Sequence, residues 1–309
     1  MPEHRTYPLE KSPLHGLQSK KKLYELLRTN KDDINKLLES KNNYVELQLT
    51  KKGKKRDIAD PKKILKNIQA NLLKFLSRIS TPEYLFSGKK GVCYIDNARY
   101  HIPCRFVVTY DLRDFYPTCS REAVYRFFRF KLKMSEDTSW LLTDLTTHKG
   151  SLPHGSPCSQ LLAYWAYQDM FDKIESYANQ NKIRFSLYVD DMTLSSIHQT
   201  KKKMDTEISS IVREYGHSIK EKKTKRYYPS SQKEITGCII SSDNQLRVPN
   251  SKRKDIIDSI RNLKKVDGVF DSMTIKKAMG KVRAAKQIEP QIFNEIFSEM
   301  SVMAEMIEE

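Results

Sequence analysis

The sequence contains few cysteines and no long apolar segment, and each absence excludes a class of protein. Its five cysteines are scattered, their total is odd, and none forms a Cys-x-x-Cys pair. This spacing argues against a disulfide framework or a zinc site and indicates reduced thiols in a cytoplasmic protein. No apolar run approaches the roughly 18 residues of a membrane-spanning helix, and the first residues lack the apolar core of a signal peptide. We therefore expect a cytoplasmic protein with no membrane partner.

Acidic residues are in deficit. The 309-residue chain has 55 Lys and Arg against 38 Asp and Glu, which gives a net charge of +17. Residues 220–286 hold 18 basic and 7 acidic residues and so carry +11 of this charge, whereas the stretch from Glu289 onward is acidic. Such an excess indicates a polyanionic partner, most simply nucleic acid. Because ribosomal and membrane-surface proteins are basic too, the charge predicts the class of partner and not the activity.

An acidic pair interrupts a strand-like segment at residues 183–196. Apolar and polar residues alternate up to Val189, Asp190 and Asp191 follow, and a second strand-like run begins at Met192. Adjacent carboxylates repel one another and are unfavourable in strands, and a bound cation often compensates such a local penalty. Taken alone, an Asp-Asp pair is also an ordinary turn. The pattern predicts a hairpin that presents two carboxylates.

A third carboxylate, upstream in the chain, also lies at the end of a strand-like segment. Residues 105–117 form a short apolar strand that ends in Asp111, followed by a second acid, Asp114, two aromatic residues and a proline. Carboxylates together with substrate phosphates are the usual ligands of Mg²⁺. Asp111 with Asp190 and Asp191 would supply a two-metal site for displacement at phosphorus.

The first third of the chain predicts a basic-tipped hairpin followed by a long helix. Residues 44–49 alternate as a strand, and residues 51–56 form a turn rich in Lys and Arg before the chain returns. Residues 60–61, Asp-Pro, have the form of an N-cap followed by proline at the first helical position. Apolar residues then recur every three or four positions, which predicts a helix over 61–79. We expect Gln69 on this helix to face solvent.

A glycine-containing loop precedes a helix in the middle of the chain. The loop, residues 150–160, carries Gly155 between two prolines, which predicts a tight turn whose backbone amides meet a ligand at a helix N-terminus. The aromatic stripe on the helix that follows is expected to pack in the core. Its members are Tyr164, Tyr167, Phe171 and Ile174.

The last third predicts short strands and then helices. Residues 218–224 form a lysine-rich segment, and residues 234–240 and 245–248 predict two strands around an Asp-Asn turn. Residues 252–306 predict three helices, the third opened by Pro290.

These features occur in an order that resembles reverse transcriptases, and among them the bacterial retron-type enzymes. The order is strand-Asp111, Pro-x-Gly loop, Tyr-Val-Asp-Asp and lysine-rich turn. The retron part of the resemblance rests on Asn97-Ala-x-x-His101 ahead of the first catalytic strand and on Ile235-Thr-Gly237, which is close to a Val-Thr-Gly signature. Two positions depart from the family loop: His154 replaces a glutamine that contacts the incoming nucleotide, and Gln160 replaces a proline.

The resemblance implies an α+β right-hand polymerase fold with fingers, a palm containing an antiparallel sheet and a short helical thumb. We expect N-terminal helices and fingers over 1–105 and the first catalytic palm strand over 106–119. Fingers and palm continue over 120–160. The palm with the aspartate and primer-grip hairpins then covers 161–248, and the thumb covers 249–309.

The resemblance also implies roles for particular residues. Asp111, Asp190 and Asp191 would be catalytic and would bind two Mg²⁺ ions with the carbonyl of Leu112. Tyr116 would be a steric gate against ribonucleotides. The further residues expected to bind nucleotide are Arg56, His154, Gly155 and either Lys222 or Lys223. The residues expected to bind RNA or primer are Asn97, His101, Thr236, Gly237, Lys252 and Arg253.

The implied function is an RNA-directed DNA polymerase of a retron. Such an enzyme copies part of its own structured non-coding RNA from dNTPs and joins the DNA to a guanosine 2′-OH, usually in anti-phage defence beside an effector protein. Three alternatives remain: a template-independent abortive-infection polymerase, a free-standing group II intron type enzyme, and a non-catalytic RNA-binding scaffold. The missing maturase extension disfavours the second, and the three intact aspartates disfavour the third, whereas His154 speaks for it.

Overall fold

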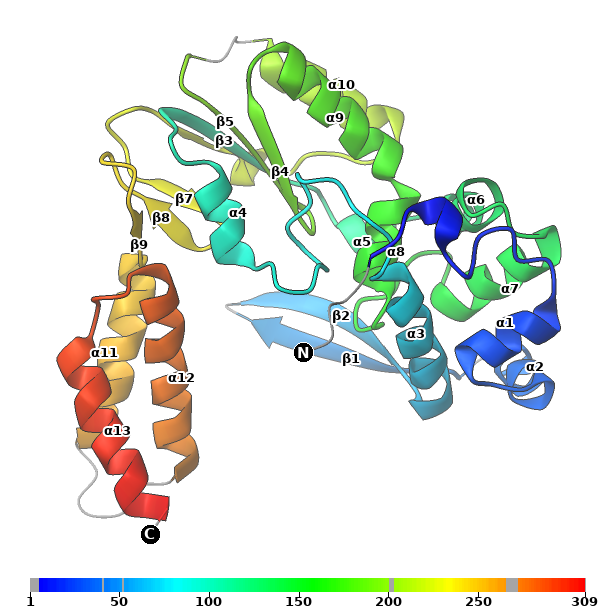
Figure 1. Cartoon of the computed structure of the whole chain (residues 1–309), viewed down its shortest axis with the longest axis horizontal. Helices are drawn as coiled ribbons and strands as arrows, with labels where there is room; N and C mark the ends of the chain where they lie inside the picture. Colours follow the sequence, from blue (N-terminus) through cyan, green and yellow to red (C-terminus); the bar gives the residue numbers. More distant parts are fainter. Residues whose placement is uncertain (1–5, 41, 52, 200–202, 265–271, 309) are drawn as a thin grey trace.

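The computed structural model describes residues 6–40, 42–51, 53–199, 203–264 and 272–308. Three regions follow one another in space (Figure 1): helices with a two-stranded hairpin, a central four-stranded sheet, and a bundle of three helices. This mixture of helices and antiparallel sheets confirms the expected α+β fold class. None of the described helices is long and apolar enough to cross a membrane.

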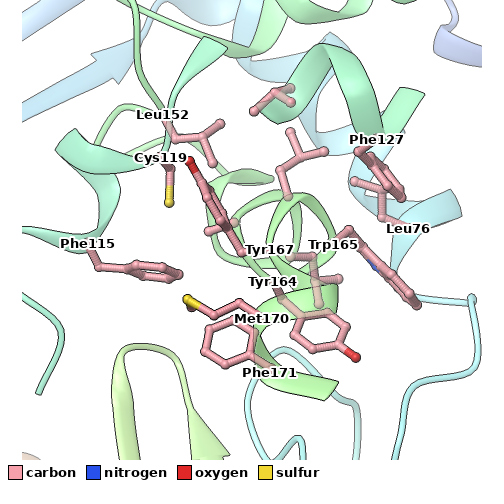
Figure 2. Close-up of a cluster of buried hydrophobic side chains, with 14 of the residues drawn as sticks. Leu76, Phe115, Cys119, Phe127, Leu152, Tyr164, Trp165, Tyr167, Met170 and Phe171 are labelled. Atoms are coloured by element: carbon pink, nitrogen blue, oxygen red, sulfur yellow. The ribbon is translucent and has the colours of Figure 1, made fainter. Parts of the chain in front are cut away.

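The first region packs helices from two parts of the chain around one core. Its helices are α1 (Lys20–Leu27), α2 (Lys31–Glu39), α3 (Lys63–Leu76), α6 (Arg121–Arg126), a π-helical turn (Phe127–Lys131), α7 (Glu136–Thr146) and α8 (Ser159–Ala166). Ser19 caps α1 as its position predicts, accepting a hydrogen bond from the Lys22 amide at 3.3 Å. The predicted aromatic stripe is buried, which confirms its structural role, and Figure 2 shows Tyr164, Tyr167 and Phe171 in this core. It does not lie on one helix as predicted, because α8 ends at Ala166 and a second helix begins at Gln168.

Gln69 is the clearest error of prediction in this region. It is fully buried instead of solvent-exposed. Its amide donates to the Tyr44 hydroxyl at 3.1 Å and to the Leu145 carbonyl at 2.8 Å, and its oxygen accepts from Ser156 at 2.8 Å. The side chain therefore ties α3 to the hairpin, to α7 and to the loop before α8. Satisfied hydrogen bonds make this burial tolerable.

The basic hairpin consists of β1 (Tyr44–Lys51) and β2 (Lys54–Pro61), in the register Tyr44↔Pro61. The strands are longer than expected and the turn shorter, because most of the predicted 51–56 turn pairs in the ladder. Asp60 and Pro61 belong to β2 instead of opening α3, whose N-cap is Lys62 without a side-chain hydrogen bond. Asp60 instead forms an ion pair with Lys66 at 2.8 Å.

The central sheet has the antiparallel order β4-β5-β3-β6, with β3 (Phe106–Asp111), β4 (Arg184–Tyr188), β5 (Asp191–Ser196) and β6 (Lys225–Tyr227). Helices α9 (Gln168–Gln180) and α10 (Met204–Glu214) pack their apolar side chains against one face. The other face carries polar residues at alternate positions and faces α4 (Tyr94–Tyr100). One face of the sheet therefore packs into the hydrophobic core, and the other carries polar side chains.

A small second sheet connects this palm to the helical bundle. Its order is β7-β8-β9, with β7 (Lys233–Ile235), β8 (Cys238–Ile240) and β9 (Leu246–Arg247). The predicted single strand over 234–240 is wrong, because Thr236 and Gly237 have φ of +44° and +78° and turn the chain between β7 and β8. The predicted turn at Asp243 and Asn244 does separate β8 from β9.

The bundle contains α11 (Asn250–Lys264), α12 (Ser272–Ile288) and α13 (Asn294–Glu308), so the three expected helices are present. The third begins at Asn294 and not at Pro290. Its apolar core, which includes Ile256 and Val282, is continuous with Ile95 of α4 and Ile235 of the second sheet. Short helical turns complete the chain at Leu9–Lys11, Phe115–Thr118 (α5) and Glu221–Lys223.

Candidate active site

A cleft of about 1080 Å³ lies on the polar face of the palm sheet. Its walls come from the sheet, from β2, from the loop before α8 and from the turn between β7 and β8. Most of the residues expected to act in catalysis or nucleotide binding line it: Arg56, Asp111, Leu112, Tyr116, His154, Asp190, Asp191, Lys222 and Lys223. Two of the residues expected to bind RNA or primer, Thr236 and Gly237, line it as well.

Sheet register brings the three aspartates to one place. Asp111 is the last residue of β3 and lies opposite Asp191, the first residue of β5. Asp190 occupies the turn between β4 and β5, and its carbonyl accepts a hydrogen bond from the Leu112 amide at 3.2 Å. Val189 enters this turn with φ of +60°, a strained conformation for a β-branched residue. Strands and turn together hold acids that are 79 residues apart in sequence, from position 111 to position 190.

The electrostatics of these acids indicate an unfavourable concentration of negative charge. Burial raises the pKa of Asp190, and the neighbouring Asp111 raises it further. Burial, then Asp190 and Asp111, raise the pKa of Asp191 to about 6. Lys223 acts in the opposite direction on both groups. Carboxylates that repel one another in this way favour a bound cation.

The donor chemistry of this site fits a divalent metal ion, although its ligands are not assembled in this conformation. Three carboxylates are hard oxygen donors of the kind that Mg²⁺ binds. In the described part of the chain, no three His, Cys, Asp or Glu side chains converge closely enough to form a metal site. The Asp111 carboxylate instead forms an ion pair with Lys223. The Lys223 ammonium therefore provides the positive charge at Asp111 in this structure.

The structure distinguishes Lys222 from Lys223, the two lysines that the sequence leaves as alternatives for contact with the triphosphate. Lys223 contacts Asp111, whereas Lys222 is exposed at the rim of the cleft. Sequence reasoning missed further charged residues of the cleft wall, among them Lys220, Lys225 and Glu234. Lys225 lies opposite Thr109 in the β3–β6 pairing and forms an ion pair with Glu234 at 2.7 Å. The alternation along β6 is too short to reveal this position.

The loop before α8 docks directly on β2. The Ala59 amide donates to the His154 carbonyl at 2.8 Å. Gly155 has φ of +105°, and a Cβ there would lie 3.0 Å from the Ala59 carbonyl oxygen. Only glycine fits this combination of backbone conformation and close approach. Gly155 thus supports the wall from behind and is not itself among the residues that line the cleft.

Tyr116 and His154 form an aromatic wall beside the acids. Their ring centroids are 4.8 Å apart at an interplanar angle of 70°. Burial raises the pKa of Tyr116, and Asp190 raises it further. Burial lowers the pKa of His154, and Arg56 lowers it as well. At neutral pH His154 is therefore an uncharged ring that packs against Tyr116.

Asn97 and His101 lie outside the cleft. The prediction that they contact RNA directly is not met in this structure. Both side chains are fully buried. Burial lowers the pKa of His101 to about 3, so its ring is neutral. A side chain without exposed surface cannot touch RNA in this conformation, and both residues instead hydrogen-bond to the palm and to the second sheet.

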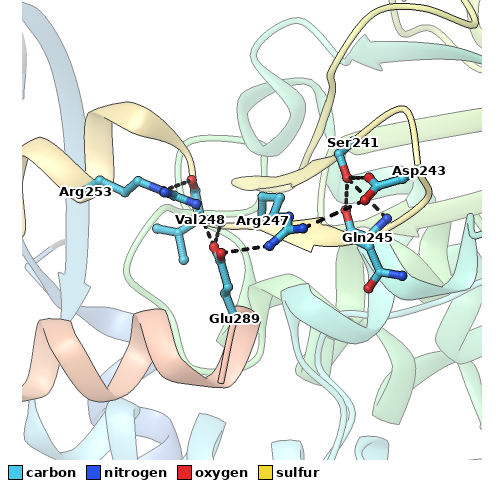
Figure 3. Close-up of polar contacts among 7 residues, drawn as sticks. All are labelled: Ser241, Asp243, Gln245, Arg247, Val248, Arg253 and Glu289. Carbon is cyan, nitrogen blue, oxygen red and sulfur yellow. Dashed lines mark hydrogen bonds and ion pairs between the residues drawn. The ribbon is translucent and has the colours of Figure 1, made fainter. Parts of the chain in front are cut away.

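Lys252 and Arg253 are held by contacts within the protein. Lys252 Nζ donates to the Gly237 carbonyl at 2.8 Å. Arg253 donates to the Val248 carbonyl at 3.0 Å and to Glu289 at 2.7 Å. Figure 3 shows Glu289 between Arg253 and Arg247, so one carboxylate joins α12 to both ends of the β9–α11 connection. Arg253 is thus a structural link between palm and thumb, which its sequence position alone does not reveal.

Comparison with known proteins agrees with this geometry. The family model for reverse transcriptase (RNA-dependent DNA polymerase) matches residues 40–240. The chain is 30% identical over 222 residues to the Retron Se72 reverse transcriptase of Salmonella heidelberg (strain 579083-10), covering 69% of this chain and 58% of that protein. It is 31% identical over 211 residues to the Retron Ec86 reverse transcriptase of Escherichia coli, covering 67% and 65%. The chain thus spans about three fifths of the length of these curated relatives.

Solved structures show the same fold. A foamy viral protease-reverse transcriptase in complex with double-stranded DNA matches with a TM-score of 0.52 and 16% identity, over 85% of this chain and 39% of that one. Telomerase from Candida albicans matches with a TM-score of 0.52 and 11% identity, over 86% and 57%. The architecture is a right-hand polymerase fold, and the chain belongs to the reverse transcriptase family and resembles the retron-type enzymes of bacteria.

Proposed function

We propose that this protein is the RNA-directed DNA polymerase of a retron. The observation that carries the proposal is the single cleft in which three family-pattern aspartates meet basic residues from β2 and from the lysine-rich segment. A polyanionic triphosphate and the end of a nucleic acid strand are the substrates that suit such a mixture of charges.

Each of these residues has a role that its position supports. Asp111, Asp190 and Asp191 would hold the divalent cations, which we propose are two Mg²⁺ ions, with the Leu112 carbonyl as an additional ligand. The ions would supply charge neutralisation and an activated primer hydroxyl; the new bond to the α-phosphorus forms as the bond to the leaving pyrophosphate breaks. Arg56 and Lys222 would bind the triphosphate, and Lys223, now paired with Asp111, would be free to turn to the phosphates once a cation occupies the site. These cationic side chains stabilise charge that develops on the phosphate oxygens.

Sugar selection follows from the aromatic wall. The Tyr116 ring lies beside Asp190 and is fixed by its packing against His154 and Phe115. We propose that it occupies the space that a ribose 2′-OH would need, so that dNTPs are preferred to rNTPs. The uncharged His154 ring completes the nucleotide site, with Gly155 behind it against β2, and His154 contacts the base pair by packing instead of by the amide of the family glutamine.

The retron assignment adds a specific template and product. We propose that the thumb and palm bind a cognate structured non-coding RNA, that synthesis begins at a guanosine 2′-OH of this RNA, and that the single-stranded DNA product stays attached through a 2′-5′ branch. The basic stretch from Lys220 to Lys286 supplies charge for the RNA backbone. We further propose that the system acts in anti-phage defence with an effector protein, by analogy with the retron relatives.

The test is to express the protein with its upstream flanking DNA, extract nucleic acid and treat it with RNase. The control is the double variant Asp190→Ala/Asp191→Ala. The proposal predicts a discrete short DNA, linked to RNA before RNase treatment, that appears only with both aspartates present.

Other outcomes contradict the proposal in distinguishable ways. Heterogeneous DNA made without a template would identify an abortive-infection polymerase. RNA bound equally by both forms, with no DNA from either, would leave a scaffold without catalysis.

A further inference from the structure

We propose that α4 is a positioning element which holds two separate walls of the cleft: His101 positions the aspartate hairpin, and Asn97 positions the Thr236–Gly237 turn. The inference rests on the proposed polymerase function, in which that turn contacts the primer. It assigns to Asn97 and His101 a role that differs from the RNA contact expected of them.

His101 bridges the two strands that carry the aspartates. Its Nδ1 lies 2.7 Å from the Ser195 hydroxyl of β5, and its Nε2 lies 2.7 Å from the Ser186 hydroxyl of β4. Both serines and the ring are fully buried. A neutral imidazole has one donor and one acceptor nitrogen, so it can satisfy two hydroxyls at once. The ring thereby fixes the separation of β4 and β5 behind the turn at Asp190.

The second contact of α4 is with the turn between β7 and β8. Asn97 Nδ2 donates to Thr236 Oγ1 at 3.2 Å, and Thr236 Oγ1 donates to the Tyr94 carbonyl at 2.9 Å. Asn97 is fully buried and Thr236 lines the cleft. The hydrogen bonds therefore connect the interior of α4 with the surface that meets substrate.

The conformation of this turn shows why it needs support. Thr236 has φ of +44°, which is a genuine outlier for a β-branched residue. Such conformations persist where surrounding contacts over-determine them, and they concentrate at functional sites. Gly237 follows with φ of +78°, and its carbonyl accepts from Lys252 of α11 at 2.8 Å. The turn is thus held from α4 on one side and from the thumb on the other.

The Asn97 amide indicates that this position is kept for its hydrogen bond. Its Oδ1 is buried and has no hydrogen-bond partner among the described residues. An unpaired buried acceptor is destabilising, so an apolar residue would suit the interior better if packing alone mattered. The side chain is explained by the one bond that it donates, to Thr236.

The two contacts predict two different kinetic defects. Displacing the Thr236–Gly237 turn weakens the hold on primer–template and leaves the chemical step intact, because the aspartates remain in place. Loosening β4 and β5 misplaces the aspartates and slows the chemical step. The first defect is a raised KM for primer–template, and the second is a lowered kcat.

The experiment uses primer extension on a homopolymeric RNA template with an annealed DNA primer, with primer–template and dTTP varied separately. Asn97→Leu removes one hydrogen bond to the turn and is expected to raise the KM for primer–template by roughly fivefold. Thr236→Val removes this bond and also the bond to the Tyr94 carbonyl, so its effect should be at least as large. The double variant is expected to match Thr236→Val, because Asn97 then has no bond to the turn left to lose. Thr236→Ser restores the hydroxyl and is expected to recover the affinity lost in Thr236→Val.

His101 is tested through its partners, since replacement of a buried ring can unfold the chain. Ser186→Ala and Ser195→Ala each remove one hydroxyl and are expected to lower kcat several-fold with the KM for primer–template within about twofold of wild type. Asn71→Leu is the matched control. It removes a partly buried hydrogen bond from the Asn71 side-chain amide to the Leu27 carbonyl, in the first region and away from the cleft. Its kinetic constants should equal those of wild type.

Additive effects of Asn97→Leu and Thr236→Val, or equal losses in kcat and KM in every variant including Asn71→Leu, would overturn the inference. Failure of the proposed function looks different: wild type and Asp190→Asn would extend the primer equally or not at all. In that case fluorescence anisotropy with the same RNA–DNA duplex decides the inference. The inference predicts that Asn97→Leu and Thr236→Val each bind the duplex more weakly than wild type, with no further loss in the double variant. If both variants bind as tightly as wild type, the inference is wrong.

Discussion

Two hairpins contribute to the same cleft and are built in opposite ways. In the β4–β5 hairpin eight of the eleven strand residues are buried, Leu187 fully, and Asp191 is exposed at the turn. In the β1–β2 hairpin the apolar side chains of β1 beyond Tyr44 are exposed, with Leu47 at 50% and Leu49 at 55%. The first hairpin carries the aspartates and the second carries Arg56.

The difference separates chemistry from substrate capture. Carboxylates that hold metal and primer must be fixed within a fraction of an ångström, and a fully packed hairpin clamped by His101 supplies that rigidity. A hairpin with few buried contacts belongs to the part of a structure that opens most easily. The β1–β2 hairpin is therefore the part of the cleft wall that the fold holds least tightly.

The largest expected effect is on the acids of the packed hairpin. Under the proposed mechanism Asp191→Asn removes a metal ligand and should lower the rate of nucleotide incorporation by roughly a thousandfold or more. The same change should leave the melting temperature equal or higher, because burial and the neighbouring Asp190 and Asp111 raise the pKa of Asp191 and so oppose its charged form. Primer extension and thermal melting measure the two. A variant that is both active and less stable would show that Asp191 is structural.

A matched pair of leucines tests the packing contrast directly. Leu187→Ala in β4 should destabilise the protein by about 2–5 kcal/mol, the usual loss for a buried leucine. Leu47→Ala in β1 should change the free energy of unfolding by no more than about 0.5 kcal/mol, as for other exposed positions. Urea denaturation at pH 7.5 gives both values. Equal losses at the two sites would mean that the β1–β2 hairpin is covered in solution.

Acid should destabilise the packed palm through its buried histidines. Burial lowers the pKa of His101 to about 3 and that of His217 to about 4. Between these values and the unfolded value near 6.5, the unfolded chain binds more protons, so stability falls as pH decreases below 6.5. At pH 5 each histidine should account for about 2 kcal/mol of lost stability.

The control for this pH effect is His101→Asn. The stability difference between wild type and this variant should shrink by about 2 kcal/mol from pH 7.5 to pH 5, because only wild type loses the contribution of His101. Denaturant titrations at the two pH values measure it. A difference that does not change with pH would show that His101 is accessible to protons in the folded protein.

The smallest effect concerns the open hairpin. Arg56→Ala should raise the KM for dNTP roughly tenfold, with the melting temperature unchanged, because Arg56 is exposed in this structure and its expected contact is with the triphosphate. Lys63→Ala, an exposed position that does not line the cleft, is the control for general loss of positive charge. Equal effects of the two variants would indicate long-range attraction instead of a specific contact.

The sequence predicts the active site better than it predicts the parts that support it. Asp111, Asp190 and Asp191 could be found because their strand settings recur in the order of the reverse transcriptase motifs, whereas an Asp-Asp pair alone is also an ordinary turn. The role of Gln69 could not, because a glutamine on an amphipathic helix is usually exposed, and the partners that make its burial tolerable come from residues 25 and 76 positions away in the chain.

Competition between local and long-range bonds explains the other errors. Asp60-Pro61 has a good capping pattern, but the ladder with Tyr44 extends β2 through Pro61 and delays the helix. Residues 234–240 have a continuous strand pattern, but Thr236 adopts a positive φ that its hydrogen bond to the Tyr94 carbonyl stabilises, and the strand is interrupted there. Asn97 and His101 were recognised through their motif, and only the packing of α4 against two sheets shows which side of the site they serve.

The most direct test of the account is primer extension by purified wild type and Asp190→Asn on an RNA template with Mg²⁺ present. The account predicts DNA whose sequence copies the RNA from wild type, and a folded Asp190→Asn protein that makes none. DNA synthesis that persists in Asp190→Asn, or that proceeds equally without template, would contradict the claim that this cleft copies RNA into DNA.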